Sequence, residues 1–197
     1  MSRTTGSLPL AAACAATVLL AVPTPAHGAP AARPAKCTDD HGRMRDSRGR
    51  SSVDGHEIRW EDETRFDDAR KYATKVWTSS GLTKVKLKPD AWDTIADLQW
   101  RDTNTTSGKW RNIFGKWEPH TGADSIYLNR AYLDNGRNHG NDRDRRKVAA
   151  HELGHALGFC HKSANWYFTL MEAEHQYLPN DGKPTSQDRK NYHALWG

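Results

Sequence analysis

Long apolar runs are almost absent from this sequence. The run at residues 8–22, rich in Ala and Leu, is shorter than the roughly 20 residues that a membrane-spanning helix requires. It follows the positive charge of Arg3 and precedes Ala26-His27-Gly28, whose small residues are typical of a cleavage site. The pattern predicts a secretory signal peptide over residues 1–28. We therefore expect a secreted, extracellular protein that makes no membrane contact once this segment is removed.

Cysteine is scarce as well, and only two cysteines remain for the mature chain. Cys14 lies inside the apolar run, so cleavage leaves Cys37 and Cys160. In an oxidising compartment, two cysteines most simply form one disulfide. Alternatively, Cys37 provides a thiolate that occupies an open metal position and keeps the protein latent. Free or intermolecular thiols are a third possibility, and the sequence leaves all three open.

The chain has no long block of one charge, although its formal net charge is +5. Lys and Arg are interspersed with Asp and Glu over most of its length, which is typical of a solvated surface. Residues 36–56 hold almost no apolar side chains. We expect residues 29–56 to form a flexible N-terminal segment, and residues 57–197 to form the folded domain. The charge pattern predicts no specific nucleic-acid partner.

The most informative segment is residues 151–161, which follows the pattern H-E-x-x-H-x-x-G-x-x-H. On an α-helix, His151 and His155 lie on one face, one turn apart. Gly158 can adopt a positive φ, end the helix and turn the chain, so that His161 approaches the same point from another direction. Three imidazoles form a Zn²⁺ site whose fourth position stays open for water, which is typical of catalytic rather than structural zinc.

Glu152 is the candidate general base beside this site. It follows His151 in sequence but lies about 100° around the helix, so its carboxylate can reach a water molecule without binding the metal. No other residue pattern indicates a nucleophilic Ser or Cys. An inactive zinc-binding relative is the main alternative, and the presence of Glu152 argues against it.

Alternation of apolar and polar residues predicts the sheet of the fold. Half-exposed strands are expected at residues 57–61, 84–88, 96–101 and 125–129, with a less regular strand at residues 110–117. Helical spacing predicts a helix from an N-cap at Thr64 to Gly81, and Thr185 with Asp188 begins a final helix. Because each strand keeps one polar face, helices should cover only one side of the sheet. We expect an α+β fold with a twisted mixed sheet of about five strands, in which strand, helix and strand form right-handed crossovers.

These features resemble the metzincin clan of zinc endopeptidases, and in particular the small secreted bacterial snapalysin-type and matrixin-like enzymes. The similarity rests on residues 151–161 and on Met171 in Thr169-Leu170-Met171-Glu172, and it extends more weakly over most of the chain from residue 57. The resemblance implies a zinc cleft between N- and C-terminal subdomains, with Met171 in a turn beneath the three histidines. Ordinary core filling is the alternative role for this methionine. Two departures stand out: snapalysin carries Asp where this chain has His161, and Ala173 stands where some metzincins place a tyrosine.

The same resemblance implies a monomeric zinc-dependent metalloendopeptidase with protein or peptide substrates. An extended substrate would add to the strand near residues 110–117, with residues 112–115 nearest the zinc. The stretch between His161 and Pro179 would line a specificity pocket, unless its aromatic residues 166–168 pack beneath the turn. Other substrate-binding residues are unassigned, and calcium binding by acidic residues such as Asp124 and Asp142 is possible but unsupported. Two alternatives remain: a narrow-specificity hydrolase of cell-wall peptides, and a non-catalytic zinc-containing adhesion or binding module.

Overall fold

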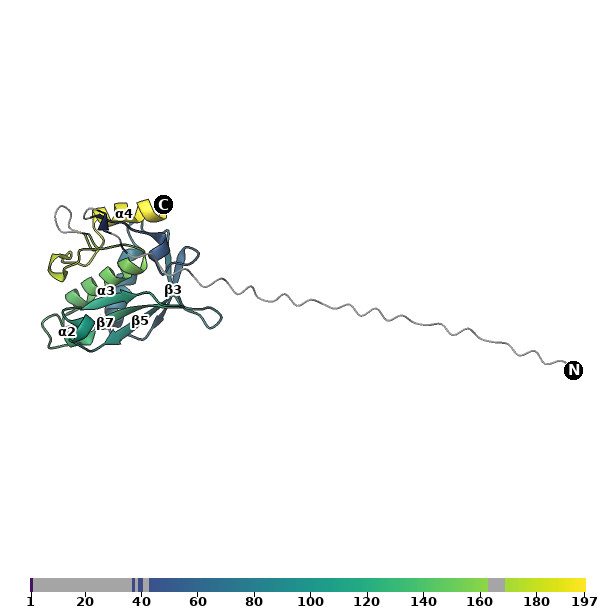
Figure 1. Cartoon of the computed structure of the whole chain (residues 1–197), viewed down its shortest axis with the longest axis horizontal. Coiled ribbons are helices and arrows are strands. Elements are labelled where there is room, and N and C mark those ends of the chain that lie inside the picture. The colour runs from purple at the N-terminus through teal and green to yellow at the C-terminus, as the bar shows by residue number, and fades with distance from the viewer. Residues whose placement is uncertain (2–36, 38, 41–42, 163–168) are drawn as a thin grey trace.

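A five-stranded mixed sheet forms the frame of the molecule (Figure 1). The computed structural model describes residues 1, 37, 39–40, 43–162 and 169–197, so the expected signal peptide and residues 166–168 lie outside the described residues. Four strands are parallel, and the last in the spatial order runs antiparallel at one edge. In spatial order the strands are β4 (Lys86–Pro89), β3 (Glu57–Asp62), β5 (Leu98–Thr103), β7 (Asp124–Asn129) and β6 (Gly115–Glu118).

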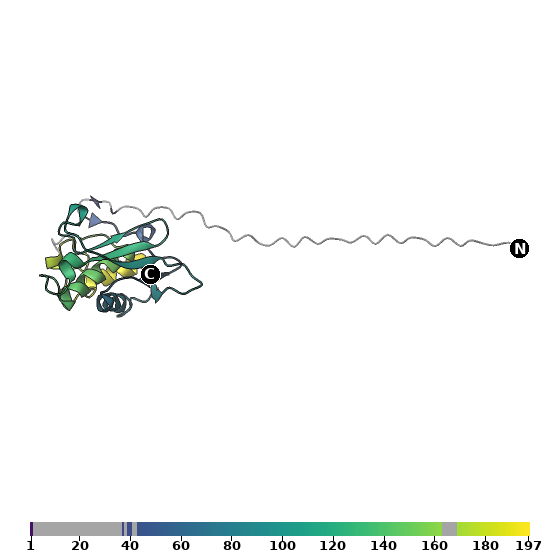
Figure 2. The ribbon, with the colours of Figure 1, turned by 90° about the horizontal axis from the view of Figure 1, so that it is seen from below.

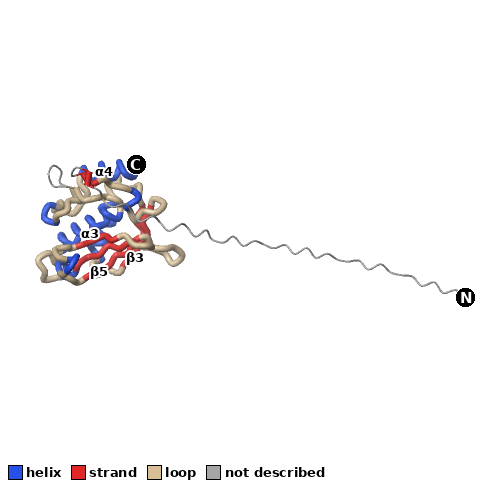
Figure 3. The backbone as a smooth tube through the Cα atoms, in the orientation of Figure 1, coloured by secondary structure: helices blue, strands red, loops and turns tan. Residues whose placement is uncertain are grey.

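Two long helices pack on one another against this sheet. They are α1 (Asp67–Trp77) and α3 (Asp142–Ala156), and α3 also contacts β6 and β7. Figure 2 shows the helices on one side of the sheet, and Figure 3 separates the layer of strands from the helices. The C-terminal helix α4 (Ser186–Trp196) lies on the side of α3 that is away from the sheet in Figure 1. This arrangement confirms the expected α+β fold with a mixed sheet of five strands.

Short elements complete the fold. They are the antiparallel pair β1 (Asp39–Asp40) and β2 (Arg43–Met44), the helix α2 (Arg130–Leu133), and the 3-10 turns η1 (Arg48–Arg50), η2 (Gly108–Trp110) and η3 (His175–Tyr177). Among the described residues, no helix combines the length and apolar character needed to cross a membrane.

The alternating strands bury their apolar face, as the sequence pattern predicts. Ile58, Leu98 and Trp100 are fully buried on β3 and β5, and Ile126 and Leu128 are fully buried on β7. Each fully buried aliphatic side chain contributes about 1.5–3 kcal/mol relative to an exposed one, so this face holds the helices in place. The core beneath the sheet therefore sets where α3, with its three functional side chains, can lie.

Several expected boundaries differ from the structure. The strands expected at residues 84–88 and 96–101 are β4 and β5, each of which begins two residues later, and the helix expected to run to Gly81 ends at Trp77. The strand expected at residues 110–117 is confined to β6, because Asn112 has a φ of 59° that interrupts an extended chain before Gly115. Helix α1 begins after Phe66 rather than at Thr64. The Thr64 hydroxyl is engaged elsewhere, since it contacts Asp102 on β5 and accepts a hydrogen bond from Phe66 N at 3.1 Å.

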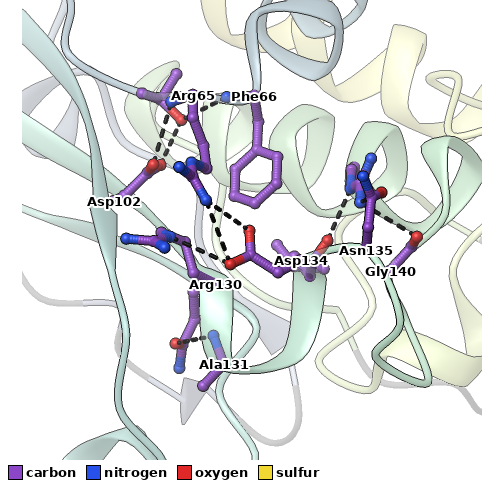
Figure 4. Close-up of polar contacts among 12 residues, drawn as sticks. Arg65, Phe66, Asp102, Arg130, Ala131, Asp134, Asn135 and Gly140 are labelled. Atoms are coloured by element: carbon purple, nitrogen blue, oxygen red, sulfur yellow. Dashed lines mark hydrogen bonds and ion pairs between the residues drawn. The ribbon is translucent and has the colours of Figure 1, made fainter.

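A polar network ties the start of α1 to β5 and to the loop that leads into α3 (Figure 4). Asp102 accepts a hydrogen bond from Arg65 N at 3.1 Å, and the Arg65 guanidinium lies 3.4 Å from Asp134. Arg130 contacts the same Asp134 carboxylate at 3.3 Å. Asp134 directly follows α2, so the network fixes the start of the connection between α2 and α3.

The N-terminal segment is more ordered than its composition suggests. Residues 45–56, expected to be flexible, pack along the end of α3: Ser47 N donates to Gly158 O at 2.9 Å, and Ser52 N donates to Ala156 O at 2.7 Å. Arg50 is only 9% exposed and its guanidinium stacks over the Trp117 ring. Hydrogen bonds, rather than apolar side chains, hold this part of the segment against the domain.

Asp97, immediately before β5, provides a test of how the stability of this sheet responds to pH. Its Oδ2 accepts a hydrogen bond from Arg59 N at 2.7 Å, and burial raises its pKa to about 6. The folded state thus binds this proton more tightly than the unfolded chain, so the free energy of unfolding falls as pH rises from about 4 to about 6. Asp97→Asn keeps an oxygen acceptor for Arg59 and removes the charge. After a discount for partial exposure, we expect it to add about 1–2 kcal/mol at pH 7.

Urea denaturation of Asp97→Asn and wild type at pH 4 and pH 7 measures this effect. The gain at pH 7 should largely disappear at pH 4, where the wild-type side chain is protonated in the folded state. Asp93→Asn, at an exposed position of the same loop, is the matched control. An equal gain at both pH values would show that charge burial is not the cause.

Candidate metal centre

Helix α3 begins and ends through local hydrogen bonds that the sequence specifies. The Asn141 side chain accepts from Asp144 N at 3.0 Å and caps the N-terminus. At the other end Gly158 has a φ of 95°, Phe159 N donates to Gly154 O at 3.0 Å, and Gly158 N donates to His155 O at 2.9 Å. This pair of bonds is the Schellman motif, which turns the chain toward His161 as predicted.

The turn brings three imidazole nitrogens together. The Nε2 atoms of His151 and His155 are 3.1 Å apart, those of His151 and His161 are 3.2 Å apart, and those of His155 and His161 are 3.1 Å apart. A tetrahedral zinc ion with Zn–N bonds of about 2.0–2.1 Å separates its ligand nitrogens by about 3.3 Å. The triangle of nitrogens therefore has the size of a zinc site.

The opposite nitrogens of two rings show which tautomer is present. His151 Nδ1 lies 2.7 Å from Leu170 O, and His155 Nδ1 lies 2.8 Å from Phe159 O. A carbonyl oxygen only accepts, so each Nδ1 carries the hydrogen and each Nε2 presents a lone pair to the centre. Lone pairs that converge at 3.1 Å repel one another unless a cation lies between them. The donor set thus fits Zn²⁺, and the two carbonyls orient its ligands.

Burial keeps the three rings neutral and so available as ligands. It lowers the pKa of His151 to about 3 and places the pKa of His155 well below its usual range. Burial also lowers the pKa of His161, and the positive charge of Arg50 adds to this. At neutral pH no proton competes with a metal for the three Nε2 atoms.

Glu152 links the helix to the edge strand of the sheet. Its carboxylate is buried, and Oε2 accepts a hydrogen bond from Trp117 N on β6 at 2.8 Å. Burial raises the pKa of Glu152 to about 8, against the opposing effects of that hydrogen bond and of Lys116. A cation held by the neighbouring histidines favours the ionised carboxylate. The strand can come this close because residue 115 is glycine: a Cβ there would lie 2.5 Å from Val148 Cγ1 and 2.9 Å from Glu152 Cγ.

Met171 lies directly against helix α3 at Gly154. It is 1% exposed, and a Cβ on Gly154 would lie 2.3 Å from its Sδ atom, so the methionine could not keep this position beside a larger residue. The residue before it, Leu170, accepts the hydrogen bond from His151 and donates its own N–H to Asp188 Oδ2 at 2.8 Å. Asp188 belongs to the capping box with Thr185 that starts α4. The C-terminal helix therefore positions the turn that supports the first histidine.

Asp46 holds both chain neighbours of the third histidine, and sequence reasoning missed it. Its Oδ1 accepts from Cys160 N at 2.9 Å and from Lys162 Nζ at 2.6 Å. Lys162 N in turn donates to Met171 O at 2.8 Å. The ligand turn is thus anchored on the N-terminal segment and on the methionine turn at once. No sequence pattern predicted this role for Asp46, because the residue lies in a segment whose composition suggests a flexible arm.

The structure joins Cys37 to Cys160 by a disulfide, with Cα atoms 5.8 Å apart. The bridge ties the N-terminal segment to the turn that carries His161. Because both sulfurs are used in this bond, Cys37 provides no thiolate to the metal position in this structure. This geometry corresponds to the disulfide interpretation rather than the latency interpretation of the two cysteines.

A cleft of about 900 Å³ runs past the histidines. Residues 112–117 form one wall, α3 forms the floor, and residues 172–176 form the other wall. Residues 112–115, expected nearest the zinc, therefore line the cleft, and so does part of the stretch between His161 and Pro179. The aromatic residues 166–168 lie outside the described residues.

The two carboxylates considered for calcium have protein partners. Asp124 accepts from Ser52 Oγ at 2.7 Å and from His120 N at 2.9 Å, and Asp142 pairs with Arg145 at 3.3 Å. Neither belongs to a group of side chains that could hold a metal within the part of the chain that the structure describes.

The role of Asp46 can be tested through zinc affinity. Asp46→Ala removes the acceptor for Cys160 N and Lys162 Nζ, so His161 loses its fixed position and the dissociation constant for zinc should rise about tenfold. Asp46→Asn keeps the first bond and should have a smaller effect. Competition with a chromophoric chelator measures the constant, and Asp93→Ala is the control. If metal-free Asp46→Ala melts earlier but binds zinc with unchanged affinity, the residue stabilises the fold without positioning the ligand.

Comparison with known proteins agrees with this geometry. The family model described as matrixin matches residues 37–197, which is most of the chain. A search of curated proteins gave no match. The matched region includes the three histidines, Glu152, Met171 and both cysteines of the disulfide. The chain belongs to the matrixin family and is a zinc metalloendopeptidase.

Proposed function

We propose that this protein is a secreted endopeptidase in which His151, His155 and His161 bind the zinc ion and Glu152 acts as general base. The observation that carries the proposal is the convergence of three neutral Nε2 atoms within 3.2 Å of one another, beside a buried carboxylate and inside an open cleft. No other described cluster combines a metal site with a candidate base in this way. Bound zinc would supply Lewis-acid activation of water and of the scissile carbonyl.

Glu152 moves the proton in this proposal. The hydrogen bond from Trp117 N fixes Oε2, which leaves Oε1 to accept a proton as water oxygen bonds to the carbonyl carbon. The same carboxyl group then donates that proton to the amide nitrogen as the C–N bond breaks. Cleavage gives a carboxylic acid and an amine, and Glu152 returns to its ionised form. The new carboxylic acid then transfers its proton to the amine, which leaves a carboxylate and an ammonium group.

The substrate is a polypeptide in extended conformation. Strand β6 pairs with β7 along one side only, and its residues line the cleft on the other. A free strand edge recognises the backbone of an extended peptide through main-chain hydrogen bonds, irrespective of whether the bond lies near a terminus. This favours cleavage of internal peptide bonds.

Two independent features support the proposal that the protein is secreted. Residues 1–28 have the charge, apolar run and small residues of a signal peptide. The bridge between Cys37 and Cys160 is a bond that persists in oxidising compartments and is rare in the cytosol. Both support action outside the cell.

Glu152→Gln tests the catalytic proposal. The amide has nearly the same shape but cannot take a proton, so casein cleavage should fall by about 10²–10⁴-fold while zinc content is unchanged. Glu63→Gln, an exposed position before α1, is the control.

Purified cell-wall peptides assayed beside casein distinguish a general endopeptidase from a narrow-specificity hydrolase. Full activity in Glu152→Gln, or absence of zinc from the wild type, would overturn the proposal.

The disulfide gives a second test that separates its two interpretations. Cys37 and Cys160 are 123 residues apart in sequence, and a cross-link over such a loop contributes about 5 kcal/mol in the chain-entropy account. The double variant Cys37→Ser, Cys160→Ser should therefore melt earlier and be no more active than the wild type. Intact mass should rise by two hydrogen masses when the wild type is reduced. An increase in activity on Cys37→Ser alone would instead support a latency thiolate.

A further inference from the structure

A second cluster of metal-capable side chains lies where three separate segments meet. His139 comes from the loop before α3, Asp144 from the first turn of α3, and His175 from η3, which follows the methionine turn. One ligand atom from each residue lies within 4.8 Å of the others. The cluster shares no residue with the first centre. Asp144 precedes His151 by seven positions, which is about 10 Å along the helix axis.

Each oxygen of Asp144 faces a different imidazole. Oδ2 is 3.2 Å from His139 Nδ1, whereas Oδ1 is 3.9 Å from His175 Nε2. The second distance is too long for a hydrogen bond. His175 Nε2 is buried and has no hydrogen-bond partner in the part of the chain that the structure describes. A buried polar nitrogen without a partner requires a physical explanation, and an ion between it and the carboxylate provides one.

The protonation states of the cluster suit a cation. Burial lowers the pKa of His175 to about 4, so its imidazole is neutral at physiological pH. The pKa of Asp144 is also below its usual range, because hydrogen bonds from Asn141 and His139 outweigh the opposing effect of burial. A neutral nitrogen, a second imidazole and a carboxylate oxygen form a common ligand set for Zn²⁺.

The surrounding structure holds the three residues in place. Asp144 receives hydrogen bonds from Asn141 Nδ2 at 3.0 Å, and Arg145 binds Asn135 Oδ1 at 2.6 Å and Gly140 O at 3.1 Å on the loop that carries His139 (Figure 4). The Phe114 ring lies 4.4 Å from the His139 ring and 5.0 Å from the His175 ring, and excludes water from one side. Arg143 approaches Asp144 at 3.8 Å, but its side chain is 64% exposed and can turn to solvent.

We propose that His139, Asp144 and His175 bind a second divalent metal ion, with zinc as the preferred metal. His175 belongs to the cleft wall that begins just after Met171, and Asp144 belongs to the helix that forms the cleft floor. A metal ion at this point joins wall to floor through coordination bonds. The second ion thus has a structural role at one end of the cleft, separate from the chemistry at the histidine triad.

Counting zinc in the purified full-length protein tests the proposal. After loading with zinc and removal of excess metal by gel filtration, elemental analysis of the wild type should give two zinc ions per chain. His175→Ala and Asp144→Asn should each give one. Asp144→Asn is the milder change, because an amide can retain the hydrogen bonds to Asn141 and His139. His120→Gln, at an exposed histidine, is the control and should keep two.

His155→Ala separates this proposal from the first centre, because it should also leave one zinc ion, held by the second cluster. One zinc ion in the wild type that is lost in His155→Ala but kept in His175→Ala would overturn the second site and leave the proposed function intact. Two ions that persist in both His175→Ala and Asp144→Asn would also overturn it. A single ion with the opposite dependence would instead overturn the assignment of the histidine triad.

Discussion

The convergence of three neutral imidazole nitrogens is the constraint on which this structure depends. Lone pairs 3.1–3.2 Å apart repel one another unless a cation lies between them, so contacts with the surrounding fold orient the three rings toward one point. Two carbonyl groups do this for the helix histidines, and they come from different places: Phe159 from the turn that ends α3, and Leu170 from the turn before Met171. The third histidine has no helix to fix it. Its position relies on Asp46 and the disulfide, which hold the residues on either side of it.

The N-terminal segment therefore acts as part of the metal centre rather than as an appendage. Ser47 N bonds to Gly158 O, and Ser47 O lies so close that a Cβ on Gly158 would be 2.5 Å away. A glycine is thus needed at position 158 for two reasons: the backbone has a positive φ, and the N-terminal segment of the same chain approaches closely. Arg50 adds a contact to Phe159 O, the same carbonyl that orients His155. Basic side chains that suggest a solvated arm by composition instead satisfy carbonyls at the negative end of the helix dipole.

Local patterns predicted the features that depend on local rules. Strand alternation, the turn at Gly158 and the capping box at Thr185 and Asp188 are set by neighbours within a few residues, and the structure contains each of them. The contacts that escaped prediction join distant positions. Asp46 meets Cys160 across more than a hundred residues, and His139, Asp144 and His175 come from three segments that only the folded chain brings together. Periodicity carries no information about such pairs, because their chemistry depends on proximity in space.

The variable positions of the pattern H-E-x-x-H-x-x-G-x-x-H hold residues that pack α3 into the core and so keep the site in place. Leu153, Ala156 and Leu157 are almost completely buried, so α3 is enclosed on nearly every side rather than presenting one polar face. Gly154 lets Met171 lie against the helix on one side, and Gly115 lets the edge strand reach Glu152 on another. A larger residue at either position would separate the helix from one of its two supports. The edge strand therefore holds the base, and the turn before Met171 holds the first histidine, on the same helix.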